Sequence, residues 1–141
     1  MGEVVVRVKL TNLVDAELAA AGDPRVPRSV EVDAIVDTGA VRSVISQGIS
    51  DQLGLRVKRQ STARLADGTV ITAGVANGLM FEILGRETEA GAFVLGDEVL
   101  IGQTVLEEMD LLVDCAGHQV IPNPRNPDGP VLALRALGNQ R

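Results

Sequence analysis

Apolar and polar residues alternate in the first part of the chain with the period of a β-strand. Residues 4–10 carry valines and a leucine at the even positions and charged residues at two of the odd ones, which predicts a strand. Residues 15–22 could form about two helical turns before the prolines that follow. The alternation returns at residues 29–36 and runs directly into Asp37-Thr38-Gly39-Ala40. A polar, glycine-containing loop therefore interrupts an apolar strand.

The rest of the chain predicts short strands with a few helical turns. Ser46 is placed to cap a short helix over residues 47–53 that ends at Gly54. Strands over 57–65 and 69–75 meet at a hairpin signal, Ala66-Asp67-Gly68. Further predicted elements are an apolar segment at 41–45, strands at 79–84, 88–95, 98–102, 111–114 and 119–121, and a helix at about 104–109. Prolines 122, 124, 127 and 130 predict an extended arm, and Val131 to Leu137 a further strand or helix.

Size and composition indicate one folded domain. The chain has 141 residues, of which 45% are hydrophobic and 23% charged, as in globular proteins. We expect a domain over residues 1–121 and a Pro-rich arm over 122–141 that packs on the domain or on a dimer interface. Aromatic residues make up only 1%, so the core must be aliphatic, which favours strands.

Charge and residue counts exclude several functions. The net charge of -6 argues against a nucleic-acid partner, because phosphate binding needs clustered Lys and Arg. No apolar stretch approaches the length of a membrane span and the start lacks a signal-peptide pattern, so we expect a cytoplasmic protein with no membrane partner. With one cysteine and one histidine, we expect no metal site and no cofactor.

An aspartate on a sharp loop after a buried strand has a specific use if a second, identical loop faces it. Two carboxylates a few ångströms apart cannot both ionise, so they share one proton. The ionised carboxylate then acts as general base on a water molecule while the protonated one donates to the scissile carbonyl oxygen.

The segment Ala34-Ile35-Val36-Asp37-Thr38-Gly39-Ala40 resembles the active-site signature of the retropepsin-like aspartic proteases (clan AA). The whole chain is similar to small prokaryotic members of that clan. The resemblance implies an all-β fold, a closed barrel with one or two short helices and one half-site per chain, completed by homodimerisation. It makes Asp37 catalytic, gives Thr38 a hydroxyl bonded across to the partner loop, and makes Gly39 the residue that permits the tight turn.

Two further segments match the family's pattern. Leu65-Ala66-Asp67-Gly68-Thr69 lies about thirty residues after Asp37 and resembles the flap that closes over substrate. Val99-Leu100-Ile101-Gly102 resembles the second hydrophobic-hydrophobic-Gly element. The expected substrate-binding residues are Ala40, Leu65, Ala66, Asp67, Gly68, Thr69, Leu100 and Ile101. One departure is Gly102-Gln103-Thr104, where retroviral enzymes usually have Gly-Arg-Asn, so the arginine that supports their dimer contact is absent.

Several residues and segments also have simpler or competing interpretations. Asp37 and Asp67 could each be turn residues, since Asp is common in turns with a nearby Gly. Asp114 begins a sequence that superficially imitates a second catalytic loop but lacks the Thr-Gly pair. Cys115 and His118 suggest a nucleophile and base, without any sign of an orienting third group. The Pro-rich arm could be a tethered surface segment or a binding motif.

The sequence therefore predicts an aspartic endopeptidase that hydrolyses peptide bonds with water activated by an Asp37 pair across a homodimer. Its expected partners are a second copy of the chain and a peptide or protein substrate. The alternative is a dimeric module on the same fold that binds peptides or proteins without cutting them.

Overall fold

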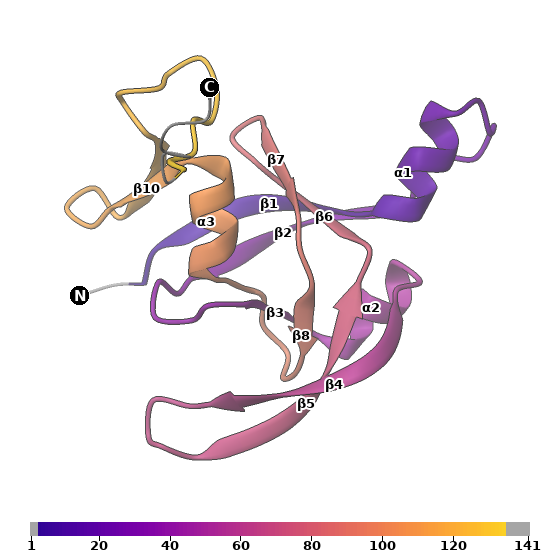
Figure 1. Ribbon diagram of the computed structural model, residues 1–141, viewed down its shortest axis with the longest axis horizontal. Helices are drawn as coiled ribbons and strands as arrows, with labels where there is room; N and C mark the ends of the chain where they lie inside the picture. The colour runs from indigo at the N-terminus through magenta and orange to yellow at the C-terminus, as the bar shows by residue number, and fades with distance from the viewer. Residues whose placement is uncertain (1–2, 135–141) are drawn as a thin grey trace, which may run out of the picture.

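The strands form one large curled sheet and one separate hairpin (Figure 1). The structure, a computed structural model, describes residues 3–134. The large sheet has nine strands in the order β4-β5-β8-β3-β9-β2-β1-β6-β7, and β10 pairs with β11 alone. The strands are β1 Val5–Asn12, β2 Ser29–Val36, β3 Ser43–Ile45, β4 Arg56–Arg64, β5 Val70–Asn77, β6 Leu79–Ile83, β7 Arg86–Glu89, β8 Ala92–Val94, β9 Leu100–Ile101, β10 Leu111–Asp114 and β11 Gln119–Pro122. The helices are α1 Leu13–Ala20, α2 Gln47–Gln52 and α3 Gln103–Met109.

The predicted mostly-β fold is confirmed, with differences in detail. The sheet is a half-barrel: β4 and β7 are its edges and do not pair with each other in the described residues. Residues 3–134 contain three helices where the resemblance implied one or two, because the helical turns predicted at 15–22 form a capped helix at 13–20. The strand predicted at 88–95 is two strands, because the chain leaves β6 at Gly91 to pair with β5 and β3. Of the element predicted at Val131 to Leu137, the part up to residue 134 is extended coil and the rest lies outside the described residues.

The alternation along β1 explains the core. Val6, Val8 and Leu10 are buried on one face, while the charged side chains between them face solvent. Apolar residues of β6, β9 and α3 complete the same cluster, in which Phe81 has the largest side chain. Because each buried aliphatic side chain contributes about 1.5–3 kcal/mol, this cluster can stabilise the fold with almost no aromatic residues.

Helix α1 is held by a buried aspartate. Asn12 caps the helix by accepting from the Asp15 backbone N–H at 2.9 Å. The Asp15 side chain, only 3% exposed, accepts from Arg28 Nε at 2.7 Å, from Nη2 at 3.1 Å and from the Arg28 backbone N–H at 3.0 Å. These bonds, and the nearby charge of Arg25, lower the pKa of Asp15 to about 2. The pair ties the loop after α1 to the first turn of the helix.

The Pro-rich arm is bound to the domain at the end of α3. Asp110, in the left-handed conformation with φ 54°, accepts from the side-chain amides of Asn123 and Asn126 and from the Val131 backbone N–H. These donors lower the pKa of Asp110. Arg86 donates to the carbonyls of Met109, Asp110 and Asn126. The arm therefore follows a defined path as far as Val131.

Asp15→Asn should destabilise the protein at neutral pH and have little effect near pH 2. The folded-state pKa of Asp15 lies below its ordinary value of 3.8, so its stabilisation is present above about pH 4 and is lost as the pH falls toward 2. Urea unfolding of both proteins at several pH values measures this.

The control for that comparison is Asp33→Asn, which removes an exposed ion pair with Arg7 at 3.3 Å and should change the midpoint little. A difference between wild type and Asp15→Asn that is the same at pH 7 and pH 2 would contradict the assigned role of the charge.

Candidate active site

The candidate catalytic aspartate begins a tight loop at the end of β2. The Gly39 backbone N–H donates to Asp37 Oδ1 at 3.1 Å, and the Ala40 N–H donates to the Asp37 carbonyl at 3.1 Å. Asp37 is half-buried, whereas Thr38 and Gly39 are exposed. Within the described residues the Thr38 hydroxyl makes no hydrogen bond. The loop thus leaves one Asp37 carboxylate oxygen and the Thr38 hydroxyl available at the surface.

Strand β9 is inserted between the two strands that flank this loop. It pairs in parallel with β2, Ile35 opposite Leu100, and antiparallel with β3, Val44 opposite Leu100. The Asp37 N–H donates to the Ile101 carbonyl at 2.9 Å. The Gln103 N–H donates to the Ala40 carbonyl at 2.7 Å. The loop is therefore fixed from both sides by one passing segment, which contains the hydrophobic-hydrophobic-Gly element identified in the sequence.

Gly102 lies inside the loop and has no room for a side chain. A Cβ on this residue would be 2.7 Å from the carbonyl carbon of Arg42, 2.9 Å from its oxygen and 3.0 Å from the Ala40 oxygen. These contacts are to backbone, which cannot move aside without moving the loop. Its buried N–H donates to Ser43 Oγ at 2.9 Å. Ser43 was not singled out from the sequence, because a serine in an apolar strand carries no signal of this role.

Next to Asp37 the sheet has a half-exposed apolar face. Side chains directly opposite each other in a sheet point to the same face, so the register places Ile35, Leu100, Val44 and Phe93 together. All four are partly exposed, in contrast to their neighbours on the core face. Leu100 is therefore partly exposed on this face, and its contact with substrate stays a prediction. The prediction for Ile101 needs correction: its side chain is 0% exposed and lies in the core. Ile101 supports the loop through its carbonyl, which accepts from the Asp37 N–H.

The predicted flap is a hairpin formed by β4 and β5. At its tip the Leu65 N–H donates to the Thr69 carbonyl at 2.7 Å and the Gly68 N–H to the Leu65 carbonyl at 2.9 Å. Asp67 accepts from the Thr69 N–H at 2.9 Å, and this bonding lowers its pKa. Gly68 has φ 88°, which a side chain would strain. Asp67 thus has the turn role that the sequence left open, while its contact with substrate, like those of Ala40 and Ala66, stays a prediction.

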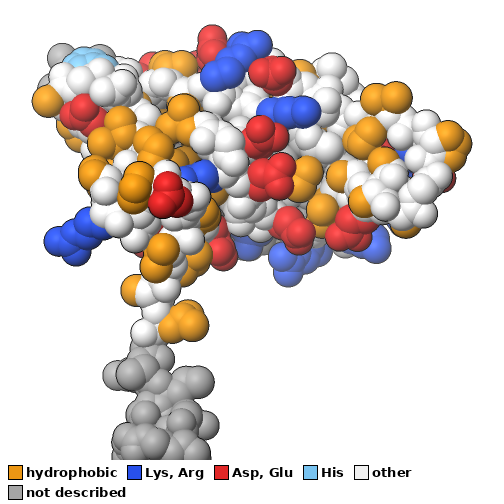
Figure 2. All heavy atoms as spheres, turned by 90° about the horizontal axis from the view of Figure 1, so that it is seen from above, with side chains coloured by type: hydrophobic (Ala, Val, Ile, Leu, Met, Phe, Trp, Pro, Cys, Tyr) orange, Lys and Arg blue, Asp and Glu red, His pale blue; other side chains and the backbone are white. Residues whose placement is uncertain are grey.

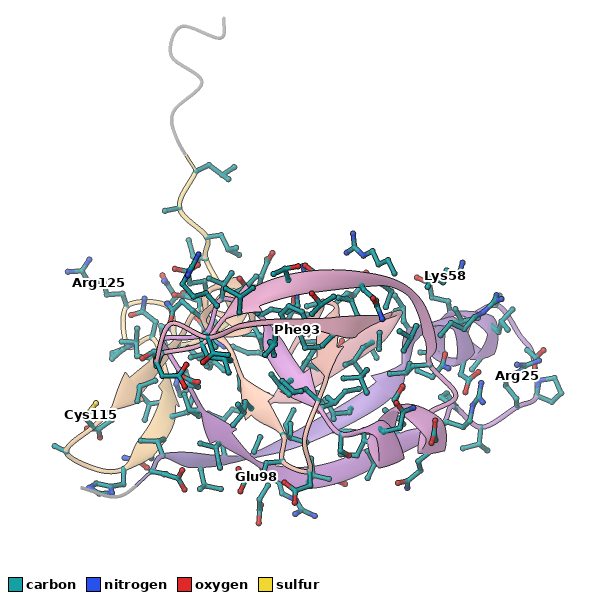
Figure 3. The ribbon with its side chains drawn as sticks, turned by 90° about the horizontal axis from the view of Figure 1, so that it is seen from below. Arg25, Lys58, Phe93, Glu98, Cys115 and Arg125 are labelled. Atoms are coloured by element: carbon teal, nitrogen blue, oxygen red, sulfur yellow. The ribbon has the colours of Figure 1, made fainter. Side chains whose placement is uncertain are left out.

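The competing candidates have structural roles. Asp114 accepts from the Gly117 N–H at 3.0 Å and from Gln119 Nε2 at 3.2 Å, which lowers its pKa and closes the β10–β11 turn. Cys115 is exposed in that same turn, at the end of the molecule far from Arg25 (Figure 3). Among residues 3–134 no group of three or more potential ligand side chains could hold a metal ion. None of the helices in that range is long and apolar enough to cross a membrane.

The sequence matches a family profile over the part of the chain that builds this site. The family, described as "gag-polyprotein putative aspartyl protease", matches residues 28–108, which is more than half of the chain. The chain belongs to this aspartyl protease family. The matched range runs from the start of β2 through the Asp37 loop and the β4–β5 hairpin into α3. A comparison with curated proteins gave no match.

Gly102→Ala should destabilise the aspartyl protease domain by roughly 1–3 kcal/mol, because the added methyl group overlaps loop backbone. Thermal unfolding measures the change. The matched control is Gly48→Ala in α2, where the nearest atom is 3.9 Å from the new Cβ and alanine favours the helix. Equal stability of both variants would show that the loop does not depend on Gly102.

Proposed function

We propose that this chain is one subunit of a homodimeric aspartic endopeptidase, in which the Asp37 side chains of two copies activate a water molecule. The observation that carries the proposal is the Asp37 loop itself, held rigidly by β9 and Gly102 yet exposed at Thr38 and Gly39. Backbone hydrogen bonds hold this loop from within while its outer side is exposed. The loop is therefore suited to pack against the identical loop of a second copy. Membership of the aspartyl protease family supports the reaction.

Several features on the side of the Asp37 loop support a dimer. The turn between β2 and β3, the tip of the β4–β5 hairpin and the β10–β11 turn all point toward the same side, opposite α1 (Figure 1). Exposed apolar side chains lie in the first two regions and in strand β10 next to the third: Val41 is 76% exposed, Leu65 42% and Leu112 43%. Burial of such side chains against a second copy would contribute to association. Because Gln103 replaces the usual arginine, we infer that apolar contacts contribute more to this dimer.

Catalysis in the dimer would use the two carboxylates in different protonation states. One Asp37 takes a proton from water while the other donates a proton to the carbonyl oxygen of the scissile bond. Addition of the water oxygen to the carbonyl carbon gives a tetrahedral diol, and its collapse breaks the C–N bond as the amine takes a proton. The Asx-type bond from the Gly39 N–H to Oδ1 fixes each carboxylate during these steps.

Thr38 and Gly39 have supporting roles in the proposal. The exposed Thr38 hydroxyl would donate across the two-fold axis to the partner loop, which accounts for its lack of a partner among residues 3–134. Gly39 allows two loops to approach closely, since it adds no side chain at the surface. The β4–β5 hairpin would cover the bound peptide as a flap and exclude water. The half-exposed face formed by Ile35, Val44, Phe93 and Leu100 would accept apolar side chains beside the cut.

The second candidate is a dimeric module that binds peptides without cutting them. It uses the same apolar face and flap, and differs only in whether the paired carboxylates turn over substrate. The Asp37 loop favours the enzyme, because a protein that only binds peptides would not need a rigidly held carboxylate at the proposed two-fold axis.

Asp37→Asn should abolish peptide cleavage while leaving the fold intact. Asn retains the oxygen that accepts the Gly39 N–H, but it cannot serve as a base, so the rate should fall by at least about 10²- to 10⁴-fold. Incubation with a mixed peptide library from acidic to neutral pH, followed by mass spectrometry, measures cleavage, and circular dichroism checks the fold.

The matched control for this test is Asp23→Asn, which changes another turn aspartate, after α1 and away from the Asp37 loop, and should retain full activity. Cleavage that survives Asp37→Asn would remove Asp37 from the mechanism. Tight binding of peptides by the wild type without any cleavage would favour the binding module.

A further inference from the structure

An arginine lies at the far edge of the apolar face that begins beside Asp37. Arg42 ends the Asp37 loop, and its guanidinium carbon is 5.5 Å from the centre of the Phe93 ring. A Cβ on Gly91 would be 2.9 Å from Arg42 Nη1, so the absence of a side chain there makes room for the guanidinium. Phe93 lies in the middle of the molecule, beneath the strands of the flap (Figure 3). The arginine therefore lies along the floor on which a peptide would be bound.

The charge of Arg42 is not neutralised within the described residues. The ion pairs found there involve Arg7, Arg25 and Arg28, all on other elements. Arg42 is half-buried and stacks on an aromatic ring, so its charged group has given up part of its hydration. A cation in such a place gains most from an anionic partner that enters the same site. Nothing in the sequence indicated this role, because a single arginine among valines is typical of an exposed position.

The flap carries further positive charge, of which Arg56 and Arg59 lie on the same face of the sheet, whereas Arg64, opposite Val70, lies on the other face. The β4–β5 hairpin carries Arg56, Lys58, Arg59 and Arg64 against a single acidic residue, Asp67, although the whole chain has a net charge of -6. By the register, Arg59 lies opposite Val75 and Arg56 opposite Asn77, on the strand face that also meets Phe93. Among the described residues none of these four cations forms an ion pair.

Acidic side chains are concentrated elsewhere. On the face seen in Figure 2, from the side opposite the flap, Asp and Glu side chains gather across the middle of the molecule. The flap itself, with four cations and one carboxylate, is thus basic on a protein that is acidic as a whole. Such a distribution attracts anionic segments toward the flap and away from the rest of the surface.

A hollow lies at the base of the flap, where β4 begins and β5 ends. It has a volume of about 380 Å³, and Arg28, Arg56, Lys58 and Asn77 are among its lining residues, with no carboxylate side chain in the lining. Arg42 is not among the lining residues, but Asn77 Oδ1 and Arg42 Nη1 approach the same point, at 3.1 Å and 2.9 Å from a Cβ built on Gly91. Arg28 is already paired with Asp15, which leaves Arg56 and Lys58 as the available charges. Lys58 lies toward the α1 end of the flap (Figure 3).

We propose that the substrate of this protein is an acidic peptide segment, in which an Asp or Glu side chain close to the apolar cleavage point binds Arg42. The proposal rests on the proposed protease function and adds the substrate class. Further acidic residues of the same segment would follow the basic base of the flap. Because a homodimer contains two copies of Arg42, the preference should occur on both sides of the cut.

The test uses a series of peptides that share one pair of apolar residues at the cleaved bond. Each peptide carries a single Glu, which is placed one position farther from that bond than in the previous peptide. Each Glu peptide is compared with the same peptide carrying Gln or Lys there, by kcat/KM at low and at high salt. At one position on each side, Glu should raise kcat/KM about tenfold over Gln, as expected for a charge-assisted hydrogen bond, and Lys should lower it. The advantage should shrink at high salt.

Variants assign the effect to Arg42. Arg42→Gln should bring the Glu-to-Gln ratio close to one, and Arg42→Glu should reverse the preference toward Lys. Arg42→Lys keeps the charge and should retain part of the preference, which separates charge from any effect of the substitution on folding. Arg125→Gln makes the same change of charge in the C-terminal arm, and its ratio should equal that of the wild type.

Binding separates this proposal from the proposed catalysis. The Asp37→Asn variant, titrated with fluorescently labelled Glu and Gln peptides, should bind the Glu peptide more tightly, and Arg42→Gln added to it should remove the difference. If Glu and Gln peptides are cleaved equally, the acidic preference is wrong while the protease stands. If the Glu peptide is bound through Arg42 but never cleaved, catalysis is wrong while the recognition stands. If no peptide of the set is cleaved or bound, both the proposed catalysis and the proposed acidic preference are wrong.

Discussion

The passage of one strand through the Asp37 loop is the constraint on which the rest of the structure depends. Strand β9 lies between β2 and β3, and its backbone bonds to the loop on both sides, from Asp37 to Ala40. This arrangement requires a glycine at 102, a buried hydroxyl at 43 and a short strand that leads directly into α3. As a result, backbone groups hold the half-buried Asp37 carboxylate at a defined place, and no other side chain of the loop is needed to position it.

Charge is distributed around this centre in a way that fits the proposed activity. The carboxylate–guanidinium pair of Asp15 and Arg28 stabilises the far end of the molecule, and its low pKa keeps it ionised in moderately acidic solution. Asp110 joins the C-terminal arm to α3. Among the described residues, the four flap cations and Arg42 form no ion pair, and the same holds for Lys9, Arg86 and Arg125. Structural ion pairs and proposed recognition charges thus occupy different parts of the chain.

The sequence predicts most of the elements because their signals are local. Alternation identified β1 and β2, and Ser46 with Gly54 marked the limits of α2. What could not be predicted depends on contacts between distant residues. The break at Gly91 arises because β7 and β8 have different partners, and the burial of Ile101 follows from insertion between two strands. The proposed role of Arg42 also depends on a distant residue, because its guanidinium lies over the ring of Phe93, which is 51 positions later in the sequence.

The central claim is that two Asp37 residues, one from each copy, form a single active centre. It is tested most directly by adding increasing amounts of inactive Asp37→Asn protein to a fixed amount of wild type and measuring cleavage after subunit exchange. If each site needs both carboxylates, mixed dimers are inactive, and activity falls toward zero as the variant takes up the wild-type subunits. Activity that stays constant however much variant is added would show that one chain acts alone and would contradict the account.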